Sequence, residues 1–360
     1  MTLENVLRMN AGDGEASYAK NSGVQEALLL KSRKVVEDCI NKYGINGFPQ
    51  CFKLADLGCS SGPNTLLPVK TIIDTVHATC QRKGLDVPEF QVFLNDLPEN
   101  DFNTTFRMVQ PFYSRLADEK GDKFKDKCFI SGVPGSFYTR LFPSGSLDFV
   151  HSSSSVHWLS QVPEKVESNK GHINIADESP PGICQAYLNQ YTRDFSTFLH
   201  LRSDEITTKG CMVLAFQGSS ADPSKSGSCR LFELLAKSLL DMSSEGFLSE
   251  AEIDSFNFPF YNPTVDEVKV IIEREGSFSL ESLQTIERRI EIQSSTNKDS
   301  MGEMVAKRIR AVNEPMLIAH FGDTFMDKLF ERYAERVAEH ISKENLEFLD
   351  LIISLTRKSY

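Results

Sequence analysis

Apolar and polar positions follow two different periods along the chain, and each change of period marks an element. Short apolar runs predict strands, whereas apolar residues repeated every three or four positions predict amphipathic helices. Seven strands are expected, at 52–57, 89–94, 128–133, 147–151, 211–217, 278–286 and 348–355. Helices are expected at 23–43, from the turn at 58–64 to about 83, from Asp101, at about 182–208, over about 229–275 with a break at 257–263, and twice between 300 and 345. Gly44 and Gly210 are expected to end two of these helices, and the polar residues 287–300 to form a loop.

The order of these elements predicts an α/β fold. Strands that alternate with helices form a mostly parallel sheet covered on both faces. Helical segments at about 156–207, 225–275 and 300–345 exceed what crossovers need, so we expect a helical cap over the carboxyl edge, where open α/β sheets bind ligands. The chain is expected to be one unit over 1–360, with its α/β core at about 45–155, 208–220, 276–290 and 346–360.

Composition narrows the classes of partner. The 360 residues are 40% apolar and 25% charged, as in ordinary globular proteins. The 39 basic and 50 acidic residues give a net charge of −11, which disfavours nucleic acid and membrane surfaces as partners. The same charge should also repel small anionic substrates.

Targeting and cysteine patterns point to the cytoplasm. No stretch approaches the roughly 20 apolar residues of a membrane span. The first residues show no basic segment followed by an apolar core, so no secretory signal is expected. The 8 cysteines form no C-x-x-C pair. We expect free thiols in a reducing compartment and no structural zinc.

A glycine-containing turn joins the first strand to its helix, with the sequence DLGCSSGPN at 56–64. Glycine lets the backbone turn tightly and lets a ligand approach the amino end of a helix. The full G-x-G-x-x-G spacing of dinucleotide sites is missing. Asp96, however, ends the second strand, where a carboxylate binds ribose hydroxyls, and Asp56 is placed to bind an ammonium group. These groups together fit S-adenosylmethionine; the alternative is that Asp96 and Asp101 only cap turns and helices.

The same turn also contains the G-x-S-x-G pattern of serine hydrolases, with Ser60 as the nucleophile. Such an elbow normally follows several strands, whereas this one follows the first. No H-G-G-G-like segment precedes it, and the late histidines His320 and His340 fall within predicted helices. A serine esterase is therefore kept as a distant alternative.

Blocks along the whole chain resemble the plant SABATH methyltransferases, which methylate carboxylates of small acids or ring nitrogens of purine alkaloids. The resemblance is carried by residues 9–22, 55–64, 93–103, 134–143, 151–163, 254–257, 275–278, 310–315 and the terminal strand. The chain most resembles the benzoate, salicylate and jasmonate carboxyl methyltransferases. This resemblance implies a class I methyltransferase fold, Rossmann-like, with a seven-stranded sheet whose last strand is antiparallel, a helical cap and a homodimer.

The resemblance also implies three sets of site residues. S-adenosylmethionine is expected to contact Tyr18, Ser22, Asp56, Cys59, Asn64, Asp96, Leu97, Ser136, Phe137 and Ser153. The acceptor carboxylate is expected to be held by the catalytic residues Gln25 and Trp158. A magnesium ion that some members bind would match Asn169, Asp254, Phe256 and Asn257, with Phe256 giving only its carbonyl and the metal having no catalytic role.

The residues themselves leave alternatives open. Tyr18, Ser22 and Gln25 are spaced to share one helix face as a pocket wall, but Ser22-x-x-Gln25 also matches a capping box. Trp158 has the alternative of a core aromatic, although a buried indole N–H usually needs a partner. The chemistry needs no general base, because a carboxyl with a pKa near 4 is already ionised at neutral pH. Positioning and water exclusion should therefore dominate.

The identity of the acceptor depends on fewer residues. Ser154 stands where many family members carry tyrosine, and together with the Val-His-Trp run at 156–158 it resembles jasmonate methyltransferases. His157 replaces a methionine of members that resemble salicylate-specific enzymes. The remaining expected wall residues are apolar, with core packing as their alternative role: Phe232, Ile309, Val312 and Phe348. We expect a jasmonate-like acid first and benzoate or salicylate second, with xanthine N-methylation as the alternative.

Overall fold

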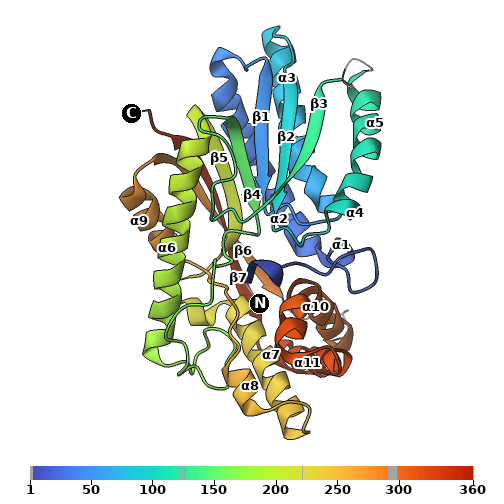
Figure 1. The fold of residues 1–360 in the computed structure, drawn as a ribbon, viewed down its shortest axis with the longest axis vertical. Coiled ribbons are helices and arrows are strands. Elements are labelled where there is room, and N and C mark those ends of the chain that lie inside the picture. Colours follow the sequence, from blue (N-terminus) through green and yellow to red (C-terminus); the bar gives the residue numbers. More distant parts are fainter. Residues whose placement is uncertain (1–2, 122–123, 125, 221, 291–297, 360) are drawn as a thin grey trace.

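A computed structural model describes residues 3–121, 124, 126–220, 222–290 and 298–359, which form a seven-stranded sheet with helices on both faces (Figure 1). The strand order is β3-β2-β1-β4-β5-β7-β6. Pairs from β3 to β5 are parallel, and β7 is antiparallel to both β5 and β6, as predicted. The strands are β1 (Cys51–Leu57), β2 (Glu89–Asp96), β3 (Cys128–Pro134), β4 (Leu147–Ser153), β5 (Ile206–Gly218), β6 (Phe278–Ile290) and β7 (Leu346–Arg357).

Helices connect these strands and also gather beyond one end of the sheet (Figure 1). The helices are α1 (Tyr18–Asn21), α2 (Gly23–Tyr43), α3 (Leu67–Lys83), α4 (Phe102–Arg107), α5 (Val109–Lys120), α6 (Pro181–Glu205), α7 (Gly227–Ser244), α8 (Glu250–Asp254), α9 (Val265–Glu275), α10 (Lys298–Phe321) and α11 (Met326–Ile341). Gly44 ends α2 as expected, and the Asp101 side chain caps α4 by accepting from Thr104 N.

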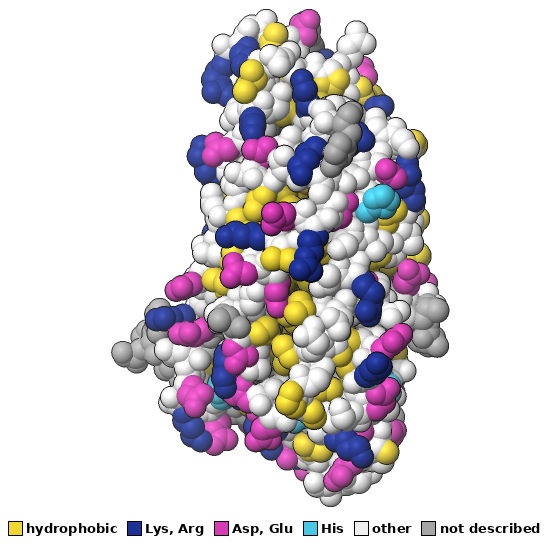
Figure 2. All heavy atoms as spheres, turned by 90° about the vertical axis from the view of Figure 1, so that its left-hand side faces the viewer, with side chains coloured by type: hydrophobic (Ala, Val, Ile, Leu, Met, Phe, Trp, Pro, Cys, Tyr) yellow, Lys and Arg dark blue, Asp and Glu magenta, His cyan; other side chains and the backbone are white. Residues whose placement is uncertain are grey.

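Acidic and basic side chains are interspersed over the face of the molecule drawn in Figure 2, without a broad patch of either sign. The net charge of −11 is therefore not gathered on this face. No helix in the described part of the chain is both long and apolar enough to cross a membrane.

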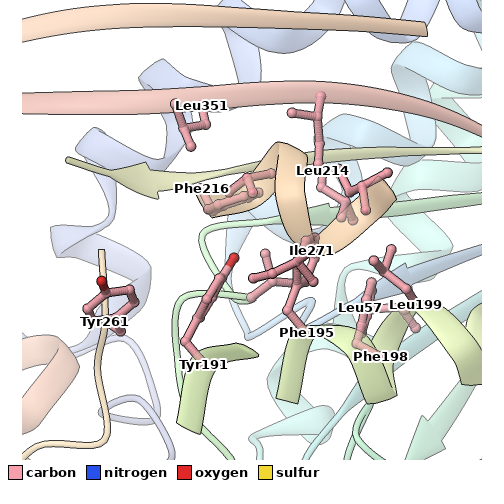
Figure 3. Packing of buried hydrophobic residues seen from close by; sticks show 14 of the residues in the cluster. Leu57, Tyr191, Phe195, Phe198, Leu199, Leu214, Phe216, Tyr261, Ile271 and Leu351 are labelled. Carbon is pink, nitrogen blue, oxygen red and sulfur yellow. The ribbon is translucent and has the colours of Figure 1, made fainter. Parts of the chain in front are cut away.

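One face of the sheet packs against α6 and α9. Side chains alternate along β5, so that Leu214 and Phe216 point to this face while Val213 points to the other. Figure 3 shows Tyr191 and Phe195 of α6 turned toward these β5 side chains. These side chains belong to an apolar cluster between the sheet, α6 and α9, and its central residues are almost fully buried.

The opposite face packs against α2, α3 and α5, whose apolar stripes carry residues such as Ile40, Ile72 and Phe112. A third apolar cluster lies beyond the sheet and joins α7, α8, α10 and α11 to Trp158 and Phe348. The helices of this third cluster correspond to part of the expected cap. The boundary drawn from the sequence between core and cap stays a prediction.

Two expected element boundaries are wrong. The helix expected through residue 208 ends at Glu205, and Gly210 lies inside β5 instead of ending the helix. The Ile206-Thr207-Thr208 run is β-branched, and Ile206 already pairs with Leu147 of β4. In the expected loop 287–300, β6 continues to Ile290 and α10 begins at Lys298, while 291–297 lie outside the described residues.

Candidate active site

A large cavity opens at the carboxyl ends of β1, β2 and β4 and measures about 1640 Å³, including its solvent-open part. Open α/β sheets bind ligands at this edge. Most of the predicted site residues line it: Tyr18, Gln25, Asp96, Leu97, Ser136, Phe137, Ser153, Ser154, His157, Trp158, Phe232, Ile309, Val312 and Phe348. The cavity therefore brings the predicted cofactor and acceptor residues to one place.

The glycine turn needs glycine at two positions. Gly58 has a φ of 75°, and a Cβ there would lie 2.1 Å from the Ser155 Oγ. Gly62 has a φ of 99°, and a Cβ there would lie 2.8 Å from the Ala19 Cβ of α1. L residues with side chains rarely adopt these φ values. The two glycines let Ser155, just beyond β4, and Ala19 of α1 pack directly against the turn.

Asp96 holds this turn from the neighbouring strand. Its Oδ2 accepts from Ser60 N and its Oδ1 from Leu97 N, both at 2.7 Å. Burial raises the pKa of Asp96 to about 6, although both hydrogen bonds lower it and the nearby Asp56 raises it further. Asp96 also lines the cavity.

Ser60 does not have the surroundings of a nucleophile. Its φ of 52° is strained, as in a hydrolase elbow, but its buried Oγ has no hydrogen-bond partner among the described residues. The His320 ring instead lies 3.0 Å from the Glu252 carbonyl oxygen, in the helical part beyond the sheet. The geometry therefore does not support a serine triad.

Four expected cofactor residues do not line the cavity. Asp56 Oδ1 lies 2.7 Å from His151 Nδ1, and this pair is buried. Asn64 Nδ2 donates to both the Ser22 carbonyl and the Ser22 Oγ at 3.0 Å. Cys59 is also buried. Their contact with the cofactor stays a prediction.

The segment that carries Ser136 and Phe137 is fixed by a fully buried ion pair at the end of α6. Arg202 Nη1 donates to the Phe137 carbonyl at 2.9 Å, and its Nε lies 2.8 Å from Glu205 Oε2. Glu205 Oε1 accepts from the amides of Leu141 and Phe142 at 2.7 and 3.0 Å. The helix end thus positions a loop that forms one wall of the cavity.

Gln25 and Trp158 both line the cavity. The Ser22 side chain makes no cap hydrogen bond, so the capping-box alternative is wrong, and the Gln25 Oε1 is buried without a partner among the described residues. The helix is interrupted at Ser22, between α1 and α2, so Tyr18 and Gln25 do not lie on one continuous helix. The Trp158 ring packs edge-on against Phe260, with centroids 5.0 Å apart.

His157 is a neutral group in this wall. Burial lowers its pKa to about 3, and the Ser154 carbonyl opposes that shift only in part. Its Nδ1 accepts from Gln217 N at 3.1 Å, so the proton is on Nε2. Ser154 itself has a φ of 58°, and its amide donates to the Ala215 carbonyl.

The N-terminal segment closes one side of the cavity with Leu3, Leu7 and Met9. It is held by Asn10. The Asn10 backbone N–H donates to the Ala311 carbonyl of α10 at 2.8 Å, and its side-chain Nδ2 donates to Glu314 Oε2 at 2.6 Å. Pro315 has no N–H, so it leaves that Ala311 carbonyl without its usual helical donor. A proline inside a helix thus provides the attachment point for the segment.

Several lining residues were not predicted from the sequence, among them Arg288, Arg308, Gln217 and Asp350. A signal was present for Arg308. It precedes Ile309 directly and Val312 by four positions, so helical spacing puts all three on one face.

The expected magnesium ligands lie outside the cavity lining and are used in protein hydrogen bonds. Asn169 Nδ2 donates to Asn257 Oδ1 at 3.1 Å, and Asp254 Oδ1 accepts from Gly171 N at 2.8 Å. An amide donor thus faces the oxygen that a cation would need, so the set as arranged does not fit a metal ion. The described residues also contain no group of three or more His, Cys, Asp or Glu placed to hold one.

The fold and this site define a class I methyltransferase. The chain is similar to a solved structure of loganic acid methyltransferase with S-adenosylhomocysteine, at 32% identity and a TM-score of 0.84 over 98% of this chain and 99% of that one. A family model described as SAM dependent carboxyl methyltransferase matches residues 4–358. The chain belongs to this family of S-adenosylmethionine-dependent carboxyl methyltransferases.

Three similar plant enzymes match this chain over almost their whole lengths. A probable jasmonic acid carboxyl methyltransferase 2 from Theobroma cacao is 46% identical over 99% of this chain and 100% of that protein. A benzoic acid/salicylic acid carboxyl methyltransferase 1 from Petunia hybrida is 45% identical over 99% of both. The jasmonate O-methyltransferase of Arabidopsis thaliana is 43% identical over 99% of this chain and 100% of that protein.

Proposed function

We propose that this enzyme methylates the carboxylate of a small lipophilic acid, jasmonate-like first and benzoate or salicylate second. One observation carries the proposal: a single cavity joins the glycine turn and Asp96 to an apolar wall that includes Phe232, Ile309 and Phe348. The names of the similar enzymes from cacao, petunia and Arabidopsis support the same class of acceptor.

We assign the residues by their surroundings. Asp96 would bind the ribose, and Ser136, Phe137 and Ser153 would line the nucleoside end. Gln25 and the Trp158 N–H would hold the acceptor carboxylate, and Ser154 and His157 would shape the wall behind it. S-adenosylmethionine supplies the methyl group as an electrophile. The protein itself orients the carboxylate and excludes water, and no side chain has to move a proton.

A panel of acids and methylxanthines with methyl-labelled S-adenosylmethionine tests the acceptor. We expect a base-labile methyl ester from lipophilic monocarboxylic acids. Label transferred only to xanthine nitrogens would replace the proposal with the N-methyltransferase alternative. Calorimetry with S-adenosylhomocysteine provides the independent check that the cofactor site is intact.

Four further properties, none of which takes part in the reaction, are also proposed. The chain would act in the cytoplasm as a homodimer, with an α/β core and a helical cap, and sedimentation velocity tests the dimer. Magnesium would have no part in transfer, because Asn169 and Asn257 bind each other. Unchanged turnover after chelation is the expected result.

A further inference from the structure

One face of α10 lines the cavity through residues spaced three and four apart: Val305, Arg308, Ile309, Val312 and Asn313. Three of these are apolar, and Arg308 is the cation among them. Arg308 is half-buried, and holding a charge beside apolar groups costs free energy unless the charge is paired. Arg308 therefore calls for an anionic or strongly accepting partner.

The protein does not supply that partner within its described residues. Arg308 has no ion pair or hydrogen bond there, and its neighbouring charge is the cation Arg288. Burial and that repulsion together lower the pKa of Arg308. Arg288 differs, because its Nη2 donates to the fully buried Asp350 at 2.9 Å and its guanidinium stands 4.9 Å from the Phe348 ring centroid. Asp350 is thus already paired.

Arg308 and the residues expected to hold the acceptor carboxylate line the same cavity but come from different elements. His157, next to Trp158, is bonded to Gln217 of β5. Gln217 pairs with Asp350 of β7, and β6, which carries Arg288, is the next strand. Strands lie about 4.8 Å apart, so the backbone of β6, whose Arg288 is the charge that acts on Arg308, runs about 10 Å from the backbone of β5. That is the length of about eight single bonds in an extended chain, at the ~1.2 Å per bond of an extended polypeptide.

We propose that Arg308 determines specificity by binding a second oxygen acceptor, a carboxylate or a ketone, at the end of the substrate remote from the methylated carboxylate. The inference rests on the proposed function and narrows its substrate class to bifunctional acids. One carboxylate gains the O–CH3 bond as the S–CH3 bond breaks, and S-adenosylhomocysteine leaves. The second oxygen group stays unchanged and accepts from the planar guanidinium, which offers two parallel donors to a carboxylate.

The test uses the full chain with S-adenosylmethionine and straight-chain acids of four to ten carbons. Each monoacid is compared with the α,ω-diacid and with the acid bearing a ketone near the far end. We expect the kcat/KM ratio of bifunctional acid to monoacid to reach tenfold or more near eight carbons. In Arg308→Gln this ratio should fall to near one, and Arg308→Lys should recover part of it.

Lys307→Gln is the matched control, because Lys307 is exposed on the same helix and does not line the cavity. It should leave the ratio unchanged, and calorimetry with S-adenosylhomocysteine should give the same Kd for every variant. Methylation of monoacids without preference for any bifunctional acid, or a ratio untouched by Arg308→Gln, overturns this inference alone. If no acid of any series yields a methyl ester, both the inference and the proposed function are wrong.

Discussion

Trp158 is the residue whose chemistry is easiest to isolate. Replacing it with phenylalanine keeps a ring against Phe260 but removes the N–H donor. A hydrogen bond to a charged group contributes about 1.5–3 kcal/mol. We therefore expect Trp158→Phe to lower kcat/KM for the acid about ten- to hundredfold, as measured by initial rates. The Kd of S-adenosylhomocysteine should not change, and wild-type kinetics in this variant would refute the assigned role.

Asp96 should make cofactor binding depend on pH. Burial raises its pKa to about 6 from its ordinary value of 3.8, so the folded protein holds this proton more tightly than the unfolded chain. Its contribution to stability is therefore fully present below pH 3.8 and is lost as the pH rises through about 6. Binding of the ribose shows the opposite trend, because the ionised carboxylate is the better acceptor.

Calorimetry with S-adenosylhomocysteine between pH 5 and 7 measures this dependence. If the ionised form binds, the Kd should fall about tenfold over that range with a midpoint near 6. Asp96→Asn should bind more weakly and without this midpoint. A Kd that is flat with pH in the wild-type enzyme would show that Asp96 does not contact the ribose.

Site residues could be predicted from the sequence where a motif fixes the local backbone. Contacts between side chains could not be predicted where strand pairing brings together residues that are distant in the sequence. Asp96 and the glycine turn follow from strand and turn patterns. The pairing of Asp56 with His151 crosses from β1 to β4 and has no local signal. The same holds for Arg288 and Asp350, which meet only because β6 and β7 pair.

At the scale of elements, the end of α6 supports the cavity wall through Arg202. Removing one partner of a buried ion pair costs about 3–5 kcal/mol, because the other charge stays buried. We expect Arg202→Met to lower the free energy of unfolding in urea by about 3 kcal/mol and to weaken S-adenosylhomocysteine binding through the displaced Phe137 carbonyl.

Arg140→Met provides the comparison, since the Arg140 side chain is 41% exposed and lies 3.6 Å from the same Glu205. Surface ion pairs contribute at most about 1 kcal/mol, so this variant should be nearly as stable as the wild type. Equal losses in the two variants would show that burial of Arg202 is not the cause.

Elements were predicted best where their apolar pattern is strong, as in the long amphipathic helix α2 and the short apolar strand β1. The start of β5 was missed because Ile206, Thr207 and Thr208 continue directly from a long helix, and Gly210 was given the weight of a stop signal. The extension of β6 to Ile290 was missed because its residues are polar, and pairing with Leu346 of β7 supplies what hydropathy did not.

At the scale of the whole molecule, the net charge of −11 repels an acid in solution even though arginines line the cavity. Salt screens this long-range term, since the Debye length falls from about 30 Å at 0.01 M to about 8 Å at 0.15 M. We expect the KM for benzoate to fall about twofold over this range in steady-state assays. A KM that rises with salt would mean that the arginines control capture at long range.

The attachment of Asn10 to α10 has a consequence for biosynthesis. Asn10 Nδ2 donates to the Arg310 carbonyl, so the two partners lie 300 residues apart in the sequence. During translation, the segment around Asn10 is made well before α10, the helix that contains Pro315. The cavity wall that the two form together is complete only after α10 has been made. Ligand binding is thus among the last properties that a nascent chain acquires, and the sheet itself is completed only when β7, which follows α10 in the chain, has been made.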